Sequence, residues 1–255
     1  MSMTQKPVSI IFHLAAGFTS FLYSQTKRTF SVMLLLAVGI ASFLYFQTKG
    51  ITLMKKTIDP SLPTIGILIF DGFLTNEAVA PMDVFTKMDS LGKKLFNVLL
   101  VSKEEKIYQS EEGLNVLPDV TIHNVTKLTV LVVPSSNEPE KQIQDKPLID
   151  FIKQQNNTTE YIASHCAGAF TLGESGVADD KKIVTYCSGS DKLQKEYPKL
   201  LVMDDAVVSV MQDGKIISSN GNLVSYIASL DLLEQMTNHS HRKYVEEQLL
   251  INKLR

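Results

Sequence analysis

Cys166 lies in a setting that favours nucleophilic chemistry. The segment "EYIAS" (160–164) has the apolar character of a buried strand, and "SHCAGAF" (164–170) follows it into a predicted helix. A nucleophile on a sharp strand-to-helix turn forms a nucleophile elbow, whose crowded backbone needs small neighbours. The sequence supplies them at Ser164, Ala167, Gly168 and Ala169.

Two interpretations of this cysteine follow from the pattern. A helix N-terminus favours the thiolate, so we predict a nucleophile that is partly ionised at neutral pH, whereas Cys187 should behave as an ordinary thiol. A small, inert core residue is the alternative, because buried cysteines are common.

Apolar runs that alternate with amphipathic ones must position this elbow. The runs 64–70, 95–102, 128–134 and 160–164 are apolar on both faces, which is typical of strands in a buried parallel sheet. The segment 207–219 has an Asp-Gly turn and predicts a hairpin. We expect helices at 77–90, 145–155, 167–175, 190–197, 222–236 and 240–253. The predicted fold class is an α/β three-layer sandwich with a mostly parallel sheet.

Residues 1–56 differ physically from the rest of the chain. They carry six Lys and Arg residues and no Asp or Glu, whereas the other 199 residues have a net charge of −8. The uncharged run 29–46 is long enough to cross a bilayer core of about 30 Å, and 7–24 resembles it at an offset of 22 residues. We predict a membrane anchor with one or two transmembrane segments at 1–56, a linker at 57–63 and one domain at 64–255.

Two other interpretations of the N-terminal segment are less favourable. A buried core helix would need a polar face, which neither apolar run has. A cleaved signal peptide would need a small-residue site, whereas "FLYFQTKG" (43–50) is bulky. The number of positive charges before the run 29–46, at Lys27 and Arg28, is nearly the same as the number of lysines after it, so the positive-inside count differs little between the two orientations. We expect the domain to be extracytoplasmic.

Several classes of site have no support in the sequence. No Gly-x-Gly-x-x-Gly or Walker-type loop follows a predicted strand, so we expect no nucleotide and no other cofactor. His239 and His241 have no Cys or carboxylate at ligand spacing, which predicts no metal site. An acidic domain is a poor partner for phosphate backbones, so we expect no nucleic acid.

Five segments from residue 65 to residue 236 occur in an order and at a spacing that are typical of a known family. They are "IGILIFDGFLTNEAVAPMDVF" (65–85), "GLNVLPDVTI" (113–122), "LTVLVVPSS" (128–136), "ASHCAGAFTLGESGVADDKKIVTY" (163–186) and "SSNGNLVSYIASLDLLEQM" (218–236). Together they resemble the ThiJ/PfpI family, with its class I glutamine-amidotransferase-like fold, nearest the subgroup that contains isonitrile hydratase.

The resemblance implies a catalytic pair. It makes Cys166 the nucleophile and Glu77 the carboxyl beside the sulfur, where the two groups share one proton or the carboxyl stays protonated as a donor to the thiolate, and Glu77 acts as general acid and base. An exposed Glu77 that stabilises a helix N-terminus is the alternative.

The sequence departs from the family pattern around this pair. Ser135 and Ser136 follow Pro134 where the family often has two glycines, and Tyr186 stands where many members have a His, so a Cys-His dyad is missing there. His165 should point to the opposite side of the sheet from Cys166. The candidate catalytic residues are Cys166, Glu77 and Tyr186, and the candidate oxyanion or substrate-binding residues are Ala167, Ser135, Ser136 and His165.

The resemblance implies a cysteine-dependent hydratase, hydrolase or lyase that acts on a small carbonyl, amide or isonitrile-type substrate. A non-catalytic ligand- or redox-sensing domain is the alternative, because the expected His and glycines are replaced. The sensor half of a transcription regulator is a third interpretation, although residues 237–255 are too short for a DNA-binding module. The expected partners are a small molecule and the lipid bilayer, and a homodimer is left open.

Deleting residues 1–56 should leave a soluble, folded domain, whereas the full chain should partition with membranes, because the apolar runs are confined to the deleted part. Fractionation of cells that express each form tests this. Recovery of the uncleaved full chain in the soluble fraction would overturn the anchor.

Overall fold

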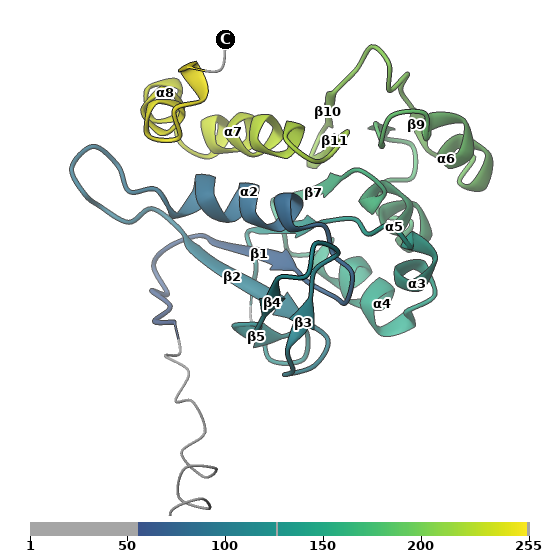
Figure 1. Cartoon of the computed structure of the whole chain (residues 1–255), viewed down its shortest axis with the longest axis horizontal. Helices are drawn as coiled ribbons and strands as arrows, with labels where there is room; N and C mark the ends of the chain where they lie inside the picture. The colour runs from purple at the N-terminus through teal and green to yellow at the C-terminus, as the bar shows by residue number, and fades with distance from the viewer. Residues whose placement is uncertain (1–55, 126, 254–255) are drawn as a thin grey trace, which may run out of the picture. The chain divides into compact units, whose positions relative to one another are not determined.

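The computed structural model describes residues 56–125 and 127–253, and the chain from Lys56 onward forms one compact unit (Figure 1). The predicted transmembrane segments, 7–24 and 29–46, lie outside these residues. Within the described ranges, no helix is both long enough and apolar enough to span a bilayer.

The predicted linker at 57–63 is hydrogen-bonded to the domain. The side chain of Asn97 accepts a hydrogen bond from the Asp59 N–H (3.0 Å) and donates to the Asp59 carbonyl oxygen (2.8 Å). It also donates to the carbonyl oxygen of Leu62, at 3.3 Å. These bonds fix the path of the chain into the first strand.

A seven-stranded sheet forms the centre of the domain, with strand order β10-β11-β7-β6-β1-β2-β5. Its pairs are parallel except for the β10–β11 hairpin. The strands are β1 (Thr64–Leu68), β2 (Asn97–Ser102), β5 (Val120–Thr121), β6 (Val130–Val133), β7 (Tyr161–His165), β10 (Val210–Asp213) and β11 (Ile216–Ser219). The four apolar runs and the Asp-Gly hairpin are therefore confirmed as strands of one mostly parallel sheet.

Helices cover both faces of the sheet and complete the predicted three-layer sandwich (Figure 1). One layer contains α2 (Thr75–Thr86), α7 (Val224–Met236) and α8 (His239–Gln248), which is followed by the 3-10 turn η1 (Ile251–Lys253). The other contains α3 (Pro139–Ile143), α4 (Lys146–Gln155) and α5 (Gly168–Ser175), with α6 (Ser190–Glu196) further along the chain.

Two small ladders were not predicted from the sequence. They are β3 (Tyr108–Gln109) with β4 (Asn115–Val116), and β8 (Lys182–Ile183) with β9 (Leu201–Val202). A strand of two residues is too short to show a hydrophobic period, so pattern analysis has no signal there. Tyr186 lies in a bend between β8 and β9.

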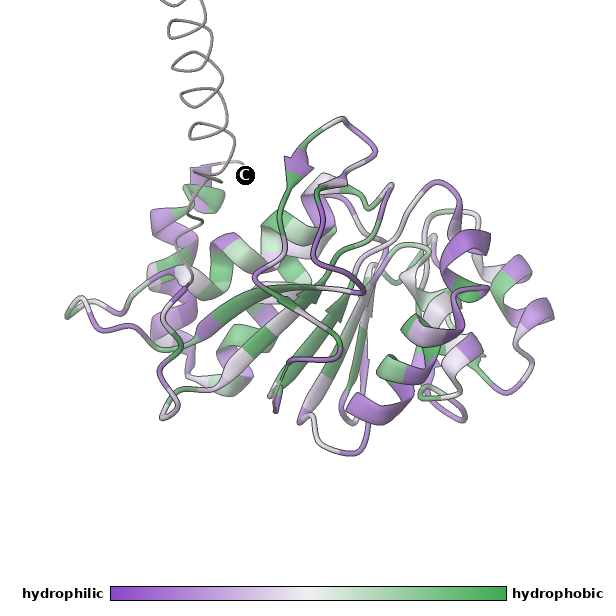
Figure 2. Ribbon diagram, turned by 90° about the horizontal axis from the view of Figure 1, so that it is seen from below, coloured by the Kyte–Doolittle hydropathy of each residue, from purple (hydrophilic) through white to green (hydrophobic). Residues whose placement is uncertain are grey.

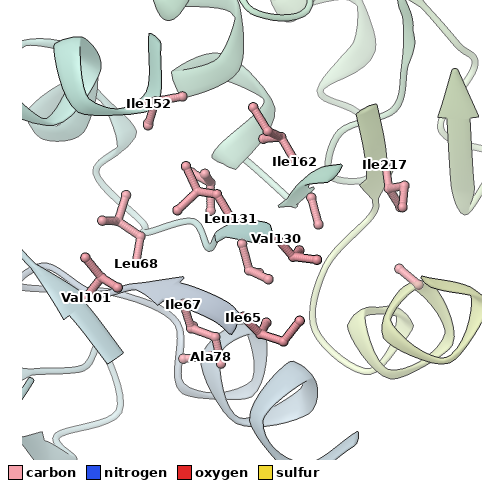
Figure 3. Close-up of a cluster of buried hydrophobic side chains, with 14 of the residues drawn as sticks. Ile65, Ile67, Leu68, Ala78, Val101, Val130, Leu131, Ile152, Ile162 and Ile217 are labelled. Carbon is pink, nitrogen blue, oxygen red and sulfur yellow. The ribbon is translucent and has the colours of Figure 1, made fainter. Parts of the chain in front are cut away.

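The core fills the space on both sides of the sheet. Successive side chains of a strand point to opposite faces, and Figure 3 shows Ile67 turned toward Ala78 of α2, whereas Leu68 points toward the side of Ile152 of α4. All of these side chains, together with Leu131 of β6, are almost completely buried. Figure 2 shows the same division, with apolar strands inside and polar residues on the outer helix surfaces.

Parallel strands β1, β6, β7 and β11 end at the same edge of the sheet. The residues that follow them are the loop into α2, the Pro134–Ser136 segment, Cys166 and the turn into α7. Because the carboxyl ends of neighbouring parallel strands meet at one edge, the fold brings these four distant segments together.

Leu131→Ala should lower the free energy of unfolding by about 2–5 kcal/mol, because it removes a fully buried side chain and leaves a cavity in the central strands. Urea unfolding measures the change. The matched control, Leu91→Ala, alters a leucine that is 90% exposed and should change stability by less than about 0.5 kcal/mol. Equal effects of the two substitutions would contradict this core assignment.

Candidate active site

Cys166 occupies a strained elbow directly after β7. Its φ of 53° lies in the left-handed region, which is unusual for a residue with a Cβ. The Cys166 N–H donates to the carbonyl oxygen of Ser219 (2.9 Å), and the Thr185 hydroxyl donates to the Cys166 carbonyl oxygen (2.9 Å). At Gly168 a Cβ would lie 2.4 Å from the Val133 carbonyl oxygen, so only glycine fits two residues after the nucleophile.

Glu77 lies beside Cys166 and is completely buried, near the start of α2. Its Oε2 accepts a hydrogen bond from the Ser135 N–H (2.7 Å), and its Oε1 accepts one from the Asn222 N–H (3.2 Å). The carboxyl is also within hydrogen-bonding reach of the Cys166 thiol. The buried position rules out the exposed, helix-stabilising alternative for Glu77.

The thiol and the carboxyl both hold their protons more tightly than in water. Burial and the negative charge of Glu77 raise the pKa of Cys166 to about 11, against weaker opposing effects from the Ser135 hydroxyl and the Ala167 N–H. Burial also raises the pKa of Glu77, although the N–H groups of Ser135 and Asn222 oppose that rise. A fully buried carboxyl and the half-buried thiol beside it therefore retain one proton between them at neutral pH.

This electrostatic setting corrects the prediction of a partly ionised Cys166. The helix N-terminus supplies a favourable N–H at Ala167, as expected, but the loss of water and the neighbouring carboxylate have larger effects on the thiol. Burial and the neighbouring carboxylate therefore disfavour the free thiolate of this cysteine. Its proton must move to a base as a bond to sulfur forms.

Gly221 and Asn222 complete the site and were not identified from the sequence. Gly221 has a φ of +87°, and a Cβ there would lie 2.2 Å from Glu77 Oε1 and 2.4 Å from the Cys166 Cβ. Asn222 has a φ of 48° and supplies the second N–H to Glu77. The available signal was "NGN" (220–222) between a strand and a helix, since Gly and Asn tolerate the left-handed region.

The structure gives different contacts to Ser135 and Ser136, the two serines predicted to bind an oxyanion or substrate. Ser135 is 2% exposed, its N–H is used by Glu77, and its hydroxyl has no hydrogen-bond partner among residues 56–125 and 127–253. That hydroxyl lowers the pKa of both Glu77 and Cys166, which places it beside the pair. The Ser136 hydroxyl instead donates to the side chain of Gln142 in α3, so Ser136 serves local structure.

His165 and Tyr186 do not contact the pair through any described hydrogen bond. The His165 ring is 1% exposed, and its Nδ1 lies 2.8 Å from the Ser219 hydroxyl oxygen. The Tyr186 ring stacks on Phe170 of α5, with centroids 6.0 Å apart, and packs against Gly189. The described contacts of the Tyr186 ring are therefore packing contacts with Phe170 and Gly189.

No metal or disulfide is built from the described residues. Within 56–125 and 127–253, no group of three or more His, Cys, Asp or Glu side chains is arranged to hold a metal ion. Cys166 and Cys187 are both free thiols, and Cys187 is exposed in the turn before α6. The chemistry therefore centres on Cys166, Glu77, Ser135 and the Ala167 N–H.

An elbow cysteine at the carboxyl edge of a parallel sheet, paired with a buried glutamate from another strand-to-helix loop, defines an α/β protein with a cysteine nucleophile elbow. Residues 63–235 match the model of the DJ-1/PfpI family, and the chain belongs to this family. The resemblance to ThiJ/PfpI proteins is thereby confirmed.

The chain is similar in sequence to isonitrile hydratase and to a DJ-1 protein. The chain is 26% identical over 187 residues to isonitrile hydratase from Pseudomonas putida, covering 72% of this chain and 77% of that protein. It is 27% identical over 141 residues to protein dj-1beta from Drosophila melanogaster, covering 54% and 73%. The crystal structure of a ThiJ/PfpI family protein from Pseudomonas syringae superposes with a TM-score of 0.65 at 18% identity, covering 78% of this chain and 82% of that one, and shows the same fold.

Glu77→Gln should lower the pH midpoint of Cys166 alkylation, because the neutral amide removes a charge that raises the pKa of the thiol. In the wild-type chain the exposed Cys187 should alkylate first at neutral pH. Mass spectrometry of the two cysteine peptides after iodoacetamide treatment measures both rates.

The matched control for this labelling is Glu247→Gln, which changes an exposed glutamate of α8 and should leave the midpoint unaltered. A wild-type Cys166 midpoint below the free-thiol value of about 8.5 would restore the original prediction of an ionised thiol.

His165 should make the domain less stable in acid. Its folded-state pKa, lowered by burial to about 3, is below its ordinary value of 6.5, so the unfolded chain binds more protons between these values. Stability should fall as pH decreases through that window, by about 1.4 kcal/mol per pH unit for this one group.

Urea unfolding between about pH 7 and pH 4 measures this slope. His165→Asn, which cannot titrate, should flatten it, whereas the control His123→Asn alters an exposed histidine and should keep it. Equal slopes for the wild type and His165→Asn would show that His165 does not contribute.

Proposed function

We propose that this protein is a cysteine-dependent hydratase, hydrolase or lyase that acts on a small isonitrile-type, carbonyl or amide substrate. The observation that carries the proposal is the buried contact between the Glu77 carboxyl and the Cys166 thiol at a strained elbow. Burying a carboxyl costs free energy, and packing alone does not offset that cost. The Glu77 carboxyl instead faces Cys166, the candidate nucleophile at the carboxyl edge of the sheet.

Glu77 acts as the proton carrier in this mechanism. For an isonitrile, the sulfur bonds to the terminal carbon while the thiol proton passes through Glu77 to that same carbon, which gives a thioimidate. Water then adds to this carbon, the C–S bond breaks, and the formamide and the free thiol result. For a carbonyl, the sulfur bonds to carbon, the oxygen takes the electron pair, and Glu77 returns the proton to that oxygen.

The raised pKa of Glu77 suits this role. A general base works best when its pKa approaches the working pH, and burial moves the carboxyl in that direction. The proton leaves sulfur only as the new bond forms, which is consistent with a thiol whose pKa is raised to about 11.

Two donors are available for negative charge that develops on the substrate. They are the unpartnered Ser135 hydroxyl and the Ala167 N–H, which lies next to the sulfur. The Ser135 N–H is not available, because it is bonded to Glu77 at 2.7 Å. The donors that stabilise an oxyanion in this protein would therefore include the Ser135 hydroxyl, whereas relatives often use the main-chain N–H of a glycine.

A non-catalytic sensing domain is the second candidate function. The packing of Tyr186 against Phe170 and Gly189 favours it, because this leaves the elbow without a second proton-transfer group. A sensing domain would bind small molecules or be oxidised at Cys166 without turnover.

We further propose that residues 1–56 attach the domain to a membrane, with the domain on the extracytoplasmic side. Support comes from the two uncharged runs at 7–24 and 29–46 and from the contrast between a basic segment and an acidic domain. A homodimer stays a prediction.

Cys166→Ser should reduce turnover of small alkyl isonitriles by at least about 1,000-fold, and Glu77→Gln by about 100-fold or more, because they remove the nucleophile and the proton carrier. Nuclear magnetic resonance detection of the formamide measures turnover. The control Cys187→Ser should retain wild-type activity. Binding of these compounds without any turnover by the wild type would favour the sensing domain.

A further inference from the structure

Ser219, the last residue of β11, contacts the elbow through both its main chain and its side chain. Its carbonyl oxygen accepts the Cys166 N–H at 2.9 Å. Its hydroxyl oxygen lies 3.2 Å from the Gly221 nitrogen and 2.8 Å from His165 Nδ1. The side chain is completely buried, so these are the partners it has in place of water.

The protons in this group can be assigned from the hydrogen-bonding capacity of each atom. Gly221 N–H can only donate, so the Ser219 oxygen accepts from it. Burial holds the His165 ring neutral, and a neutral ring with its proton on Nε2 lets Nδ1 accept the Ser219 hydroxyl proton. His165 Nε2 has no hydrogen-bond partner among residues 56–125 and 127–253 in either tautomer, and the Nδ1–Ser219 hydrogen bond is present in both.

The turn that Ser219 holds is the one that touches both members of the catalytic pair. Gly221 and Asn222 both have positive φ values, and Gly221 packs so closely against Glu77 Oε1 and the Cys166 Cβ that no side chain fits there. The Asn222 N–H then donates to Glu77 Oε1 at 3.2 Å. Glycine adopts a positive φ without steric cost, whereas Asn222 adopts one less readily, so hydrogen bonds from the surroundings help to hold this turn.

We propose that Ser219 and His165 are positioning residues that hold the Gly221–Asn222 turn, and thereby aim the Asn222 N–H at the Glu77 carboxylate. Neither residue touches the reacting atoms. Their effect on Cys166 passes through Glu77, because the Asn222 N–H favours the charged carboxylate and so keeps the shared proton on sulfur. This inference concerns the electrostatics of the pair and holds whether or not the protein turns over a substrate.

Ser219→Ala in the full chain tests the proposal through the pH profile of Cys166 alkylation. Loosening the turn weakens the Asn222 bond, Glu77 takes a larger share of the proton, and alkylation by iodoacetamide at neutral pH should become about threefold to tenfold faster. Ser218→Ala is the matched control, because that neighbouring hydroxyl is equally buried but bonds to Val184 and Met211. It should leave the profile unchanged.

The Glu77→Gln background separates positioning from simple loosening. If Ser219 acts through the carboxylate, Ser219→Ala should have no further effect on alkylation in that background. A rate increase that persists after the Glu77→Gln substitution has removed the carboxylate would instead report greater access to the sulfur, and would overturn the proposal. An unchanged profile in the single variant, with only a lower melting temperature, would overturn it as well.

His165 provides an independent pair of variants that does not depend on the folding of Ser219→Ala. His165→Asn keeps a polar atom near the Nδ1 position and should retain the wild-type alkylation profile, whereas His165→Leu should reproduce the faster rate. Identical profiles for these two variants would remove His165 from the positioning group. Failure to detect any enzymatic turnover would leave these labelling results, and the inference, unaffected.

Discussion

The buried contact between Glu77 and Cys166 is the constraint on which the rest of the site depends. Glu77 is fully buried and Cys166 is half-buried, and this burial raises the pKa of both acidic groups. Such a pair is tolerable only with one proton between its members, and only if the remaining charge receives hydrogen bonds. The N–H groups of Ser135 and Asn222 supply these bonds from two different loops.

The parallel sheet explains how the chain can hold these loops in costly conformations. The positive φ is costly at Cys166, whereas Gly221 and Asn222 tolerate it, and all three follow strands β7 and β11, which are neighbours in the sheet. The Cys166 N–H is bonded to the end of β11, so the elbow is an extension of the sheet's own ladder. A rigid edge of this kind can offset local strain, which is why strained residues gather at functional sites.

Serine in place of glycine at position 135 and tyrosine in place of histidine at position 186 change which groups can stabilise negative charge or transfer a proton. A hydroxyl at Ser135 adds a donor that glycine would lack, and it is buried without a partner of its own among the described residues. Tyr186, in contrast, stacks on Phe170. In the mechanism that we propose, Glu77 is the proton carrier and Ser135 a side-chain donor to the substrate, an arrangement that favours addition to a small polar carbon over chemistry that needs a Cys-His dyad.

The sequence by itself determined the layers, the family and the identity of the pair. Long apolar runs, an Asp-Gly turn and a cysteine among small residues are local signals, and they predicted the sheet, the hairpin and the elbow at the right places. The tertiary structure decided the protonation of Cys166 and the roles of Ser135, Gly221 and Ser219. These depend on contacts between residues far apart in the chain, such as Glu77 with Asn222, and on the exclusion of water. A helix N-terminus can be inferred from local sequence, but the burial that outweighs it exists only once the strands are assembled.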